Sequence, residues 1–116
     1  MRGVILDAAS LGEDVDLAPV LSLAGDWACH ASTPATDVAA RIRDAEVVLS
    51  NKVPLTAASL AVAPRLRLVV VMATGTNNVD LAAATQQGIA VCNARAYATA
   101  SVAQHTIMLL LALARS

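Results

Sequence analysis

The sequence predicts an α/β domain in which helices are laid on a parallel β-sheet. Short apolar runs of strand length alternate with longer stretches of helical character, the pattern of parallel strands joined by helical crossovers. The clearest run covers residues 68–72, which are Leu, three Val and Met. A continuously apolar run of this length is typical of a strand that helices cover on both faces. At 116 residues the chain has the length of one such domain.

The composition restricts which residues can form the core and which kinds of partner the protein can bind. Hydrophobic residues make up 57% of the chain but aromatic residues only 2%, with no Phe. The core must therefore be built from Val, Leu, Ile and Ala, which suits helices packed on a sheet. The net charge of -1 gives no basic surface for nucleic acid or for an anionic membrane, so we expect neither as a partner.

The cysteines and the apolar segments indicate in which compartment of the cell the protein is expected. Cys29 and Cys92 lie far apart with no metal-type spacing, so we expect no metal site and a reduced cytoplasmic protein. Cys92 has no basic neighbour in sequence to activate its thiol, so we expect it at a buried strand position rather than as a nucleophile. The apolar stretch near the N-terminus is too short for a signal-peptide core. The longest apolar run, residues 107–114, falls short of the roughly 20 residues of a transmembrane helix. We therefore expect a soluble protein.

Five strands separated by helices can be placed along the chain. The expected strands cover residues 2–6, 26–30, 47–49, 68–72 and 89–92. Helices are expected over residues 17–23 with Gly25 as C-cap, from Thr33-Pro34 onward, from Thr56 to before Pro64, and over 81–87 between Asp80 and Gly88. Short connections of this kind imply right-handed crossovers, and the expected arrangement is a flavodoxin-like five-stranded parallel sheet with helices on both faces.

The last segment differs from the rest. Residues 99–116 have helical composition with Thr99 as a plausible N-cap, and apolar residues surround the whole helix from 107 to 114. A helix that is hydrophobic all round is expected to be buried on all sides. We therefore divide the chain into a domain over residues 1–98 and a helix over 99–116 that another surface must cover.

A turn with very small side chains follows the central strand. In residues 73–78, the short side chains leave backbone N–H groups accessible, and Gly75 permits a positive φ or a close backbone approach. The carboxyl ends of parallel strands are where open α/β sheets bind ligands. The alternative is an ordinary strand-to-helix connection with Asp80 as helix cap, and from the residues alone both remain open.

Four motifs occur in one order along the second half of the chain: NKVPL, ATGTNNVDL, GIAVCNA and SVAQHT. In this order and spacing, the segment from residue 50 to 116 resembles the N-terminal region of the D-isomer-specific 2-hydroxyacid dehydrogenases. It is most similar to the glycerate dehydrogenase (hydroxypyruvate reductase) branch. The resemblance implies hydride transfer between NAD or NADP and a small 2-hydroxy or 2-oxo acid.

The same resemblance implies a substrate-binding role for two segments. Lys52 and Val53 match a loop that leans over the substrate. Thr74, Gly75 and Thr76 match the turn whose backbone N–H groups receive the substrate carboxylate. Fixed backbone donors suit this task because they need no reorganisation. Without the resemblance, Lys52 would be read as a solvated loop charge.

The resemblance also places Ala103 and Thr106 near the nicotinamide. For Thr106, a hydroxyl bonded to the preceding helical turn is an equal alternative. His105 has no Asp or Glu within one helical turn, so we expect it in packing or at an interface and assign no catalytic residue to this chain.

The resemblance implies that the catalytic histidine with its carboxylate partner, the substrate arginine and the NAD-binding Rossmann domain lie beyond the matched region. The 116 residues contain no G-x-G-x-x-G fingerprint for a pyrophosphate. We therefore expect part of a dehydrogenase that is inactive alone and binds no cofactor tightly. Its last helix, residues 101–116, is expected to form a homo-oligomer.

Two other readings remain. A receiver-type signalling domain would need an acidic cluster after the first strand and an Asp at the end of the third, where the chain has only Asp7 and Ser50-Asn51. A stand-alone flavodoxin-like binding or oligomerisation module without catalytic activity is the stronger alternative.

Overall fold

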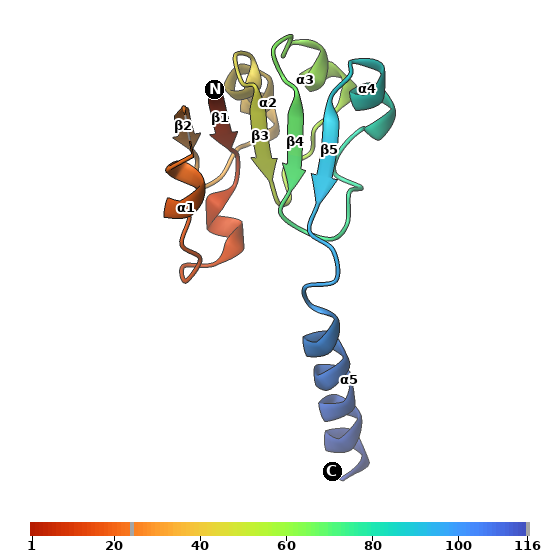
Figure 1. The fold of residues 1–116 in the computed structure, drawn as a ribbon. Coiled ribbons are helices and arrows are strands. Elements are labelled where there is room, and N and C mark those ends of the chain that lie inside the picture. Colours follow the sequence, from red (N-terminus) through yellow and green to blue (C-terminus); the bar gives the residue numbers. More distant parts are fainter. Residues whose placement is uncertain (24, 116) are drawn as a thin grey trace.

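The computed structural model describes residues 1–23 and 25–115. Its centre is a five-stranded sheet in the order β2-β1-β3-β4-β5, in which every neighbouring pair is parallel (Figure 1). The strands are β1 (Arg2–Ile5), β2 (Asp26–Cys29), β3 (Val47–Ser50), β4 (Leu68–Val71) and β5 (Ala90–Asn93). This order confirms the flavodoxin-like sheet, and all five expected strands are present within one or two residues.

The helices join the strands as the sequence predicts. They are α1 (Ala18–Leu21), α2 (Ala35–Ile42), α3 (Ala57–Ala61), α4 (Leu81–Gln86) and α5 (Thr99–Ala114), with a 3-10 helix η1 (Ala8–Leu11) after β1. The side chains of Thr56 and Asp80 cap α3 and α4 by accepting the N–H groups of Ser59 and Ala83. Gly88 follows α4 with φ 70°, as expected for a residue that ends a helix.

Three expected helix ends are wrong. Helix α1 ends at Leu21 with Ser22 as its cap, so Gly25 is no C-cap. Gly25 instead lies so close to the Met1 backbone, at the amino ends of β1 and β2, that an added Cβ would collide with it. Pro34 is itself the N-cap of α2, which begins at Ala35. Thr99 is already inside α5, and its cap residue, Ala98, makes no side-chain hydrogen bond.

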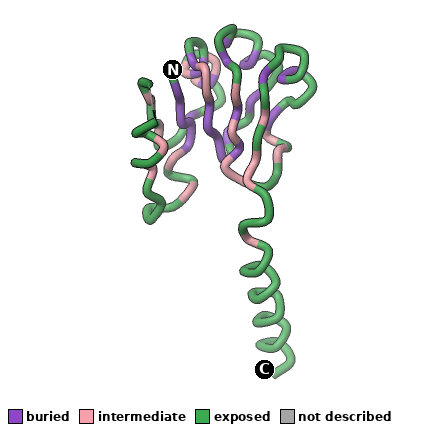
Figure 2. Tube along the Cα trace, viewed as in Figure 1, coloured by how far each residue is buried: buried purple, intermediate pink, exposed green. Residues whose placement is uncertain are grey.

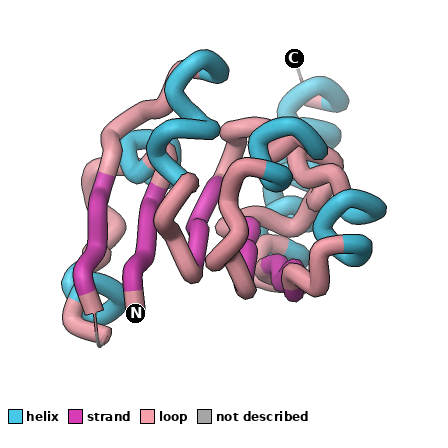
Figure 3. Tube along the Cα trace, turned by 90° about the horizontal axis from the view of Figure 1, so that it is seen from above, coloured by secondary structure: helices cyan, strands magenta, loops and turns pink. Residues whose placement is uncertain are grey.

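One face of the sheet carries the core. Alternate strand residues such as Val4, Val48 and Val69 are buried there against apolar residues of α2, α3 and α4. Seen from above, the strands form one layer and the helices lie outside it (Figure 3). Burying this aliphatic face is the main driving force for the fold.

The other face is only partly covered. Leu68 and Val70 are only half-buried there. The prediction that helices cover β4 on both faces is therefore wrong. They line an apolar hollow of about 310 Å³ together with Val20, Leu23 and Trp27 from the α1 and β2 region. Cys92 pairs with Val70 in the sheet register and is exposed, which contradicts its expected burial. Its neighbour Val91 takes the core-facing position, so alternation along β5 turns Cys92 to the open face.

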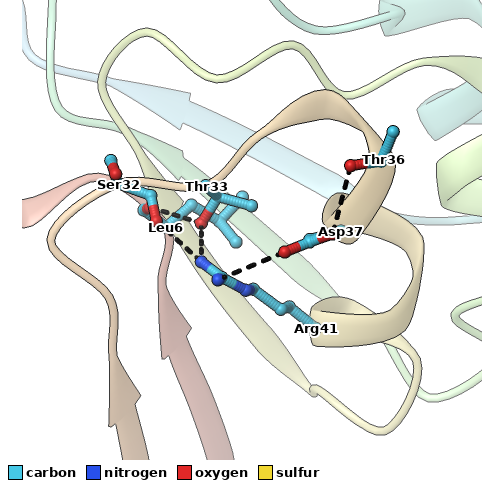
Figure 4. Close-up of polar contacts among 6 residues, drawn as sticks. All are labelled: Leu6, Ser32, Thr33, Thr36, Asp37 and Arg41. Atoms are coloured by element: carbon cyan, nitrogen blue, oxygen red, sulfur yellow. Dashed lines mark hydrogen bonds and ion pairs between the residues drawn. The ribbon is translucent and has the colours of Figure 1, made fainter.

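A polar cluster fastens the crossover from β2 to α2 (Figure 4). The buried hydroxyl of Thr33 donates to the backbone oxygen of Leu6 just after β1. Arg41 Nη1 reaches back from α2 to the backbone oxygen of Ser32 at 2.7 Å and to Thr33 Oγ1 at 2.6 Å. Its other nitrogen pairs with Asp37 at 3.5 Å. The start of α2 is thereby fixed to the carboxyl end of β1.

Helix α5 extends away from this domain (Figure 1). All of its described residues are exposed, including Ile107, Leu110 and Leu111 at 58–61% (Figure 2). The expectation that this helix is buried on all sides is therefore wrong for the single chain. No described helix is both long enough and apolar enough to cross a membrane.

Candidate functional site

The candidate site lies where β3, β4 and β5 end side by side. The loop after β3 contains Lys52 and Val53, and the turn after β4 contains Thr74, Gly75 and Thr76. Parallel strands end at one edge of the sheet, so segments more than twenty residues apart in sequence meet there. The five residues for which a substrate-binding role was predicted therefore lie in two loops at the same edge of the sheet, and two of them, Lys52 and Gly75, line one hollow.

The turn after β4 presents free backbone donors. Within residues 1–23 and 25–115, the N–H groups of Thr74, Gly75 and Thr76 donate to no protein acceptor. Gly75 does not have the positive φ that was one of its two expected roles. A Cβ at this position would lie 3.1 Å from Asn77 Oδ1, so the glycine permits a close approach instead.

The loop after β3 turns its own backbone donors inward. Asn51 N donates to Asp7 Oδ1 at 2.9 Å, and Lys52 N donates to Asp7 Oδ2 at 2.6 Å. Val53 is buried, and its N–H also faces Asp7 Oδ2 at 3.3 Å. Lys52 is therefore the exposed residue of this loop, whereas the buried Val53 anchors the loop to the domain.

Three contacts hold the loops to one another. Asn78 Nδ2 donates to the backbone oxygen of Val53 at 3.2 Å, and Leu55 forms an isolated parallel bridge with Val79. From β5, Asn93 Nδ2 donates to the backbone oxygen of Thr74 at 2.7 Å. The donors of the turn are thus fixed before any ligand arrives.

A hollow of about 170 Å³ lies between the two loops. Its lining residues are Asn51, Lys52, Ala73, Gly75, Asn77 and Asn78, among which Lys52 carries the only charge. The Lys52 side chain also borders a larger hollow of about 600 Å³ that Met72 and Tyr97 line. A site with one ammonium and several amide donors is suited to a small anion such as a carboxylate.

The residues predicted to face the cofactor lie elsewhere. Ala103 lines a separate hollow of about 440 Å³ where α5 begins, together with Thr74 and Ala98. Thr106 Oγ1 donates to the backbone oxygen of Val102 at 2.8 Å, which confirms the alternative predicted for this hydroxyl. Thr74, which belongs to the turn after β4, also lines this second hollow.

The other metal-binding or reactive side chains of the described residues form no second site. Among the described residues, no three His, Cys, Asp or Glu side chains are close enough to hold a metal ion. His105 is exposed on α5, away from the loops. Cys29 and Cys92 are on β2 and β5, the two outer strands of the sheet, so they cannot pair within one chain.

The parallel sheet and the loops at its carboxyl edge define an α/β domain of the kind that binds ligands at the carboxyl ends of its strands. Residues 5–113 match the family model "D-isomer specific 2-hydroxyacid dehydrogenase, catalytic domain", and the chain belongs to that family. The predicted family is therefore confirmed.

Two curated relatives are similar across much of the chain. A glycerate dehydrogenase of Methylorubrum extorquens is 45% identical over 80 residues, which is 69% of this chain and 26% of the relative. A hydroxypyruvate reductase of Blautia hydrogenotrophica is 40% identical over 115 residues, covering 96% of this chain and 35% of the relative. The chain spans about a third of the length of such relatives.

A solved structure has the same fold. The NAD-dependent formate dehydrogenase from Staphylococcus aureus, in complex with NAD, superimposes with a TM-score of 0.75 at 24% identity. The match covers 96% of this chain and 36% of that one. At this identity the likeness concerns the fold alone.

No role in the site was predicted for Asp7, Ser10 or Asn93. Asp7 directly follows the first strand, and a lone acid at that place was the only available signal. Its partners come 44 to 46 residues later, so no local pattern reveals them.

Proposed function

We propose that this chain forms the substrate side of an NAD(P)-dependent D-2-hydroxyacid dehydrogenase of the glycerate dehydrogenase or hydroxypyruvate reductase type. The observation that carries the proposal is the set of unpaired N–H groups at Thr74, Gly75 and Thr76, in a turn whose Gly75 lines one hollow with Lys52. The names of the two relatives supply the reaction class.

In this proposal the chain binds and orients the acid. The substrate carboxylate accepts hydrogen bonds from the turn, and the Lys52 ammonium balances its charge. Because the turn is held by Asn78 and Asn93, these donors need no rearrangement when the anion enters. Binding by fixed donors would set the orientation of C2, the carbon next to the carboxylate, toward the cofactor.

The described residues offer a place for the nicotinamide end of the cofactor but not for its pyrophosphate. Small side chains at Ala98 and Ala103 leave room for a flat ring in the hollow beside Thr74. The 116 residues contain no glycine fingerprint for the pyrophosphate. NAD or NADP, when bound, would supply or accept the hydride, and the residues that grip its phosphates would have to come from outside these 116.

The role of Lys52 can be tested in the assembled dehydrogenase that contains this domain. Lys52→Met should raise KM for hydroxypyruvate by about 10-fold or more, because a charge-assisted contact contributes about 1.5–3 kcal/mol. The effect on kcat should be smaller if the contact is equally strong in the bound substrate and the transition state. Arg65→Met, which removes an exposed cation paired with Glu46, is the matched control and should leave KM unchanged. An unchanged KM in Lys52→Met would refute this role.

A polypeptide of these 116 residues is expected to be inactive by itself. It should not oxidise NADH in the presence of hydroxypyruvate or glyoxylate, because the sequence holds no dinucleotide fingerprint. Spectrophotometry at 340 nm, the usual wavelength for NADH, would measure this, and robust turnover by the pure polypeptide would contradict the assignment.

We further infer that the protein associates with itself through residues 101–116 and works in the cytoplasm. The exposed apolar surface of α5 supports self-association. Two cysteines that cannot pair within the chain suit a reducing compartment.

A further inference from the structure

Asp7 is the most deeply buried carboxylate among the described residues, with 5% of its surface exposed. It follows β1 and precedes η1, so it lies beside the carboxyl end of β3. Its partners are not cations. Asp7 takes part in no ion pair of the described chain, and its oxygens accept backbone N–H groups instead.

These donors are three consecutive residues of the Lys52 loop. Asn51 N donates to Oδ1 at 2.9 Å, and Lys52 N and Val53 N donate to Oδ2 at 2.6 and 3.3 Å. Successive N–H groups that converge on one anion form a nest, and a buried carboxylate requires such partners to offset its lost hydration. The backbone of the loop therefore has little freedom while these hydrogen bonds are formed.

A second set of bonds joins the same segments. Asn51 Nδ2 donates to Ser10 Oγ at 2.9 Å, and that hydroxyl donates to the backbone oxygen of Asp7 at 2.6 Å. The turn after β1 and the loop after β3 are thus one hydrogen-bonded unit.

These hydrogen bonds fix the backbone at Lys52. Its N–H is directed to Asp7, while Lys52 as a residue is exposed and lines the hollow shared with Gly75, Asn77 and Asn78. Asp7 itself lines none of the hollows found at this edge of the sheet. It cannot touch a ligand there directly.

We propose that Asp7 is a positioning residue that holds the loop over residues 51–53 so that the Lys52 ammonium faces the bound acid. This inference rests on the proposed function for the role of Lys52, but the clamp itself can be measured without a substrate.

The clamp is tested by amide hydrogen exchange in the full 116-residue chain. Asp7→Asn keeps the size of the side chain but removes the charge and one acceptor. The amides of Asn51, Lys52 and Val53 should exchange at least about 10-fold faster, since charged acceptors form the stronger hydrogen bonds. The Val69 amide in β4 should not change. Asp44→Asn, at an exposed surface carboxylate, is the matched control. Unchanged exchange at residues 51–53 would overturn the inference.

If Asp7→Asn does not fold, Asp7→Glu provides the same test. It retains the charge but lengthens the side chain by one methylene, so the three donors cannot all keep their distances. Faster exchange at residues 51–53 in a folded Asp7→Glu chain supports the clamp, and parental exchange rates overturn it.

The positioning role is tested by a double-mutant cycle in the assembled dehydrogenase. Asp7→Asn should raise KM for hydroxypyruvate about 10-fold in the parent and less than about 2-fold in Lys52→Met, because both changes remove the same contact. Additive effects would show that Asp7 acts only through stability. If Lys52→Met alone has no effect on KM, the proposed function of Lys52 fails while the exchange result for the clamp stands separately.

Discussion

At the scale of single residues, Glu46 fastens the amino end of the sheet. Its carboxylate accepts the N–H of Arg2 at 2.7 Å and lies 3.7 Å from both the N-terminal ammonium and Arg65. The pKa of Glu46 lies below its ordinary value, first because of the Arg2 N–H and then because of the N-terminal, Arg65 and Arg67 charges, although desolvation opposes them. The charged form is therefore favoured in the folded chain.

This shift predicts how stability depends on pH. A group whose pKa is lowered on folding contributes stability above its unfolded pKa, about 4.3 for Glu, and the contribution disappears as pH falls through the lowered folded value. Glu46→Gln should therefore weaken the loss of urea resistance between about pH 5 and pH 3. Glu13→Gln, in the exposed loop before α1, is the control. A loss as steep in Glu46→Gln as in the parent would contradict the role of this carboxylate.

The cap residues act on single helices. Thr56→Ala removes the acceptor for Ser59 N at 3.3 Å and should lower the free energy of unfolding by about 1 kcal/mol. Thr85→Ala removes a hydroxyl that bonds back to Leu81 within α4 and should cost less than about 0.5 kcal/mol. Urea denaturation compares the two, and equal losses would mean that the cap contributes nothing specific.

At the scale of secondary-structure elements, local patterns predict the strands and several helix ends. Apolar runs marked the strands because burial selects Val and Leu, and Thr56, Asp80 and Gly88 marked helix ends because each satisfies backbone groups locally. Gly25 and Cys92 were misjudged for a different reason. Their surroundings depend on which strand lies at an edge and which face is covered, and neither is encoded nearby.

Helix α5 exposes large apolar side chains to solvent. Ile107 and Leu111 lie one turn apart on the same side, and both are more than half exposed. If α5 mediates self-association, the chain should sediment as a dimer or larger at micromolar concentration, and Ile107→Gln with Leu111→Gln should shift it toward a monomer. Leu81→Gln, at an exposed apolar residue of α4, should not. A parent chain that is already monomeric would contradict the prediction.

At the scale of the whole molecule, the site is a product of topology. The sheet order places β1 next to β3 and β3 next to β4, which brings Asp7, Lys52 and Thr74 to one edge. The motifs predict a substrate-binding role for Lys52 and for the turn after β4, because the residues of each motif are contiguous in the sequence. Asp7 could not be identified, because its role exists only after β1 and β3 have paired and the loop has folded over it.

The most direct test of the account is a titration of the folded chain with hydroxypyruvate, followed through the backbone amide signals. We predict chemical-shift changes at Thr74, Gly75 and Thr76 that are lost in Lys52→Met and absent with hydroxyacetone, which lacks the carboxylate. Changes confined to other residues, equal changes with hydroxyacetone, or no change up to millimolar concentration would contradict the proposal that this edge of the sheet receives the carboxylate of a 2-oxo acid.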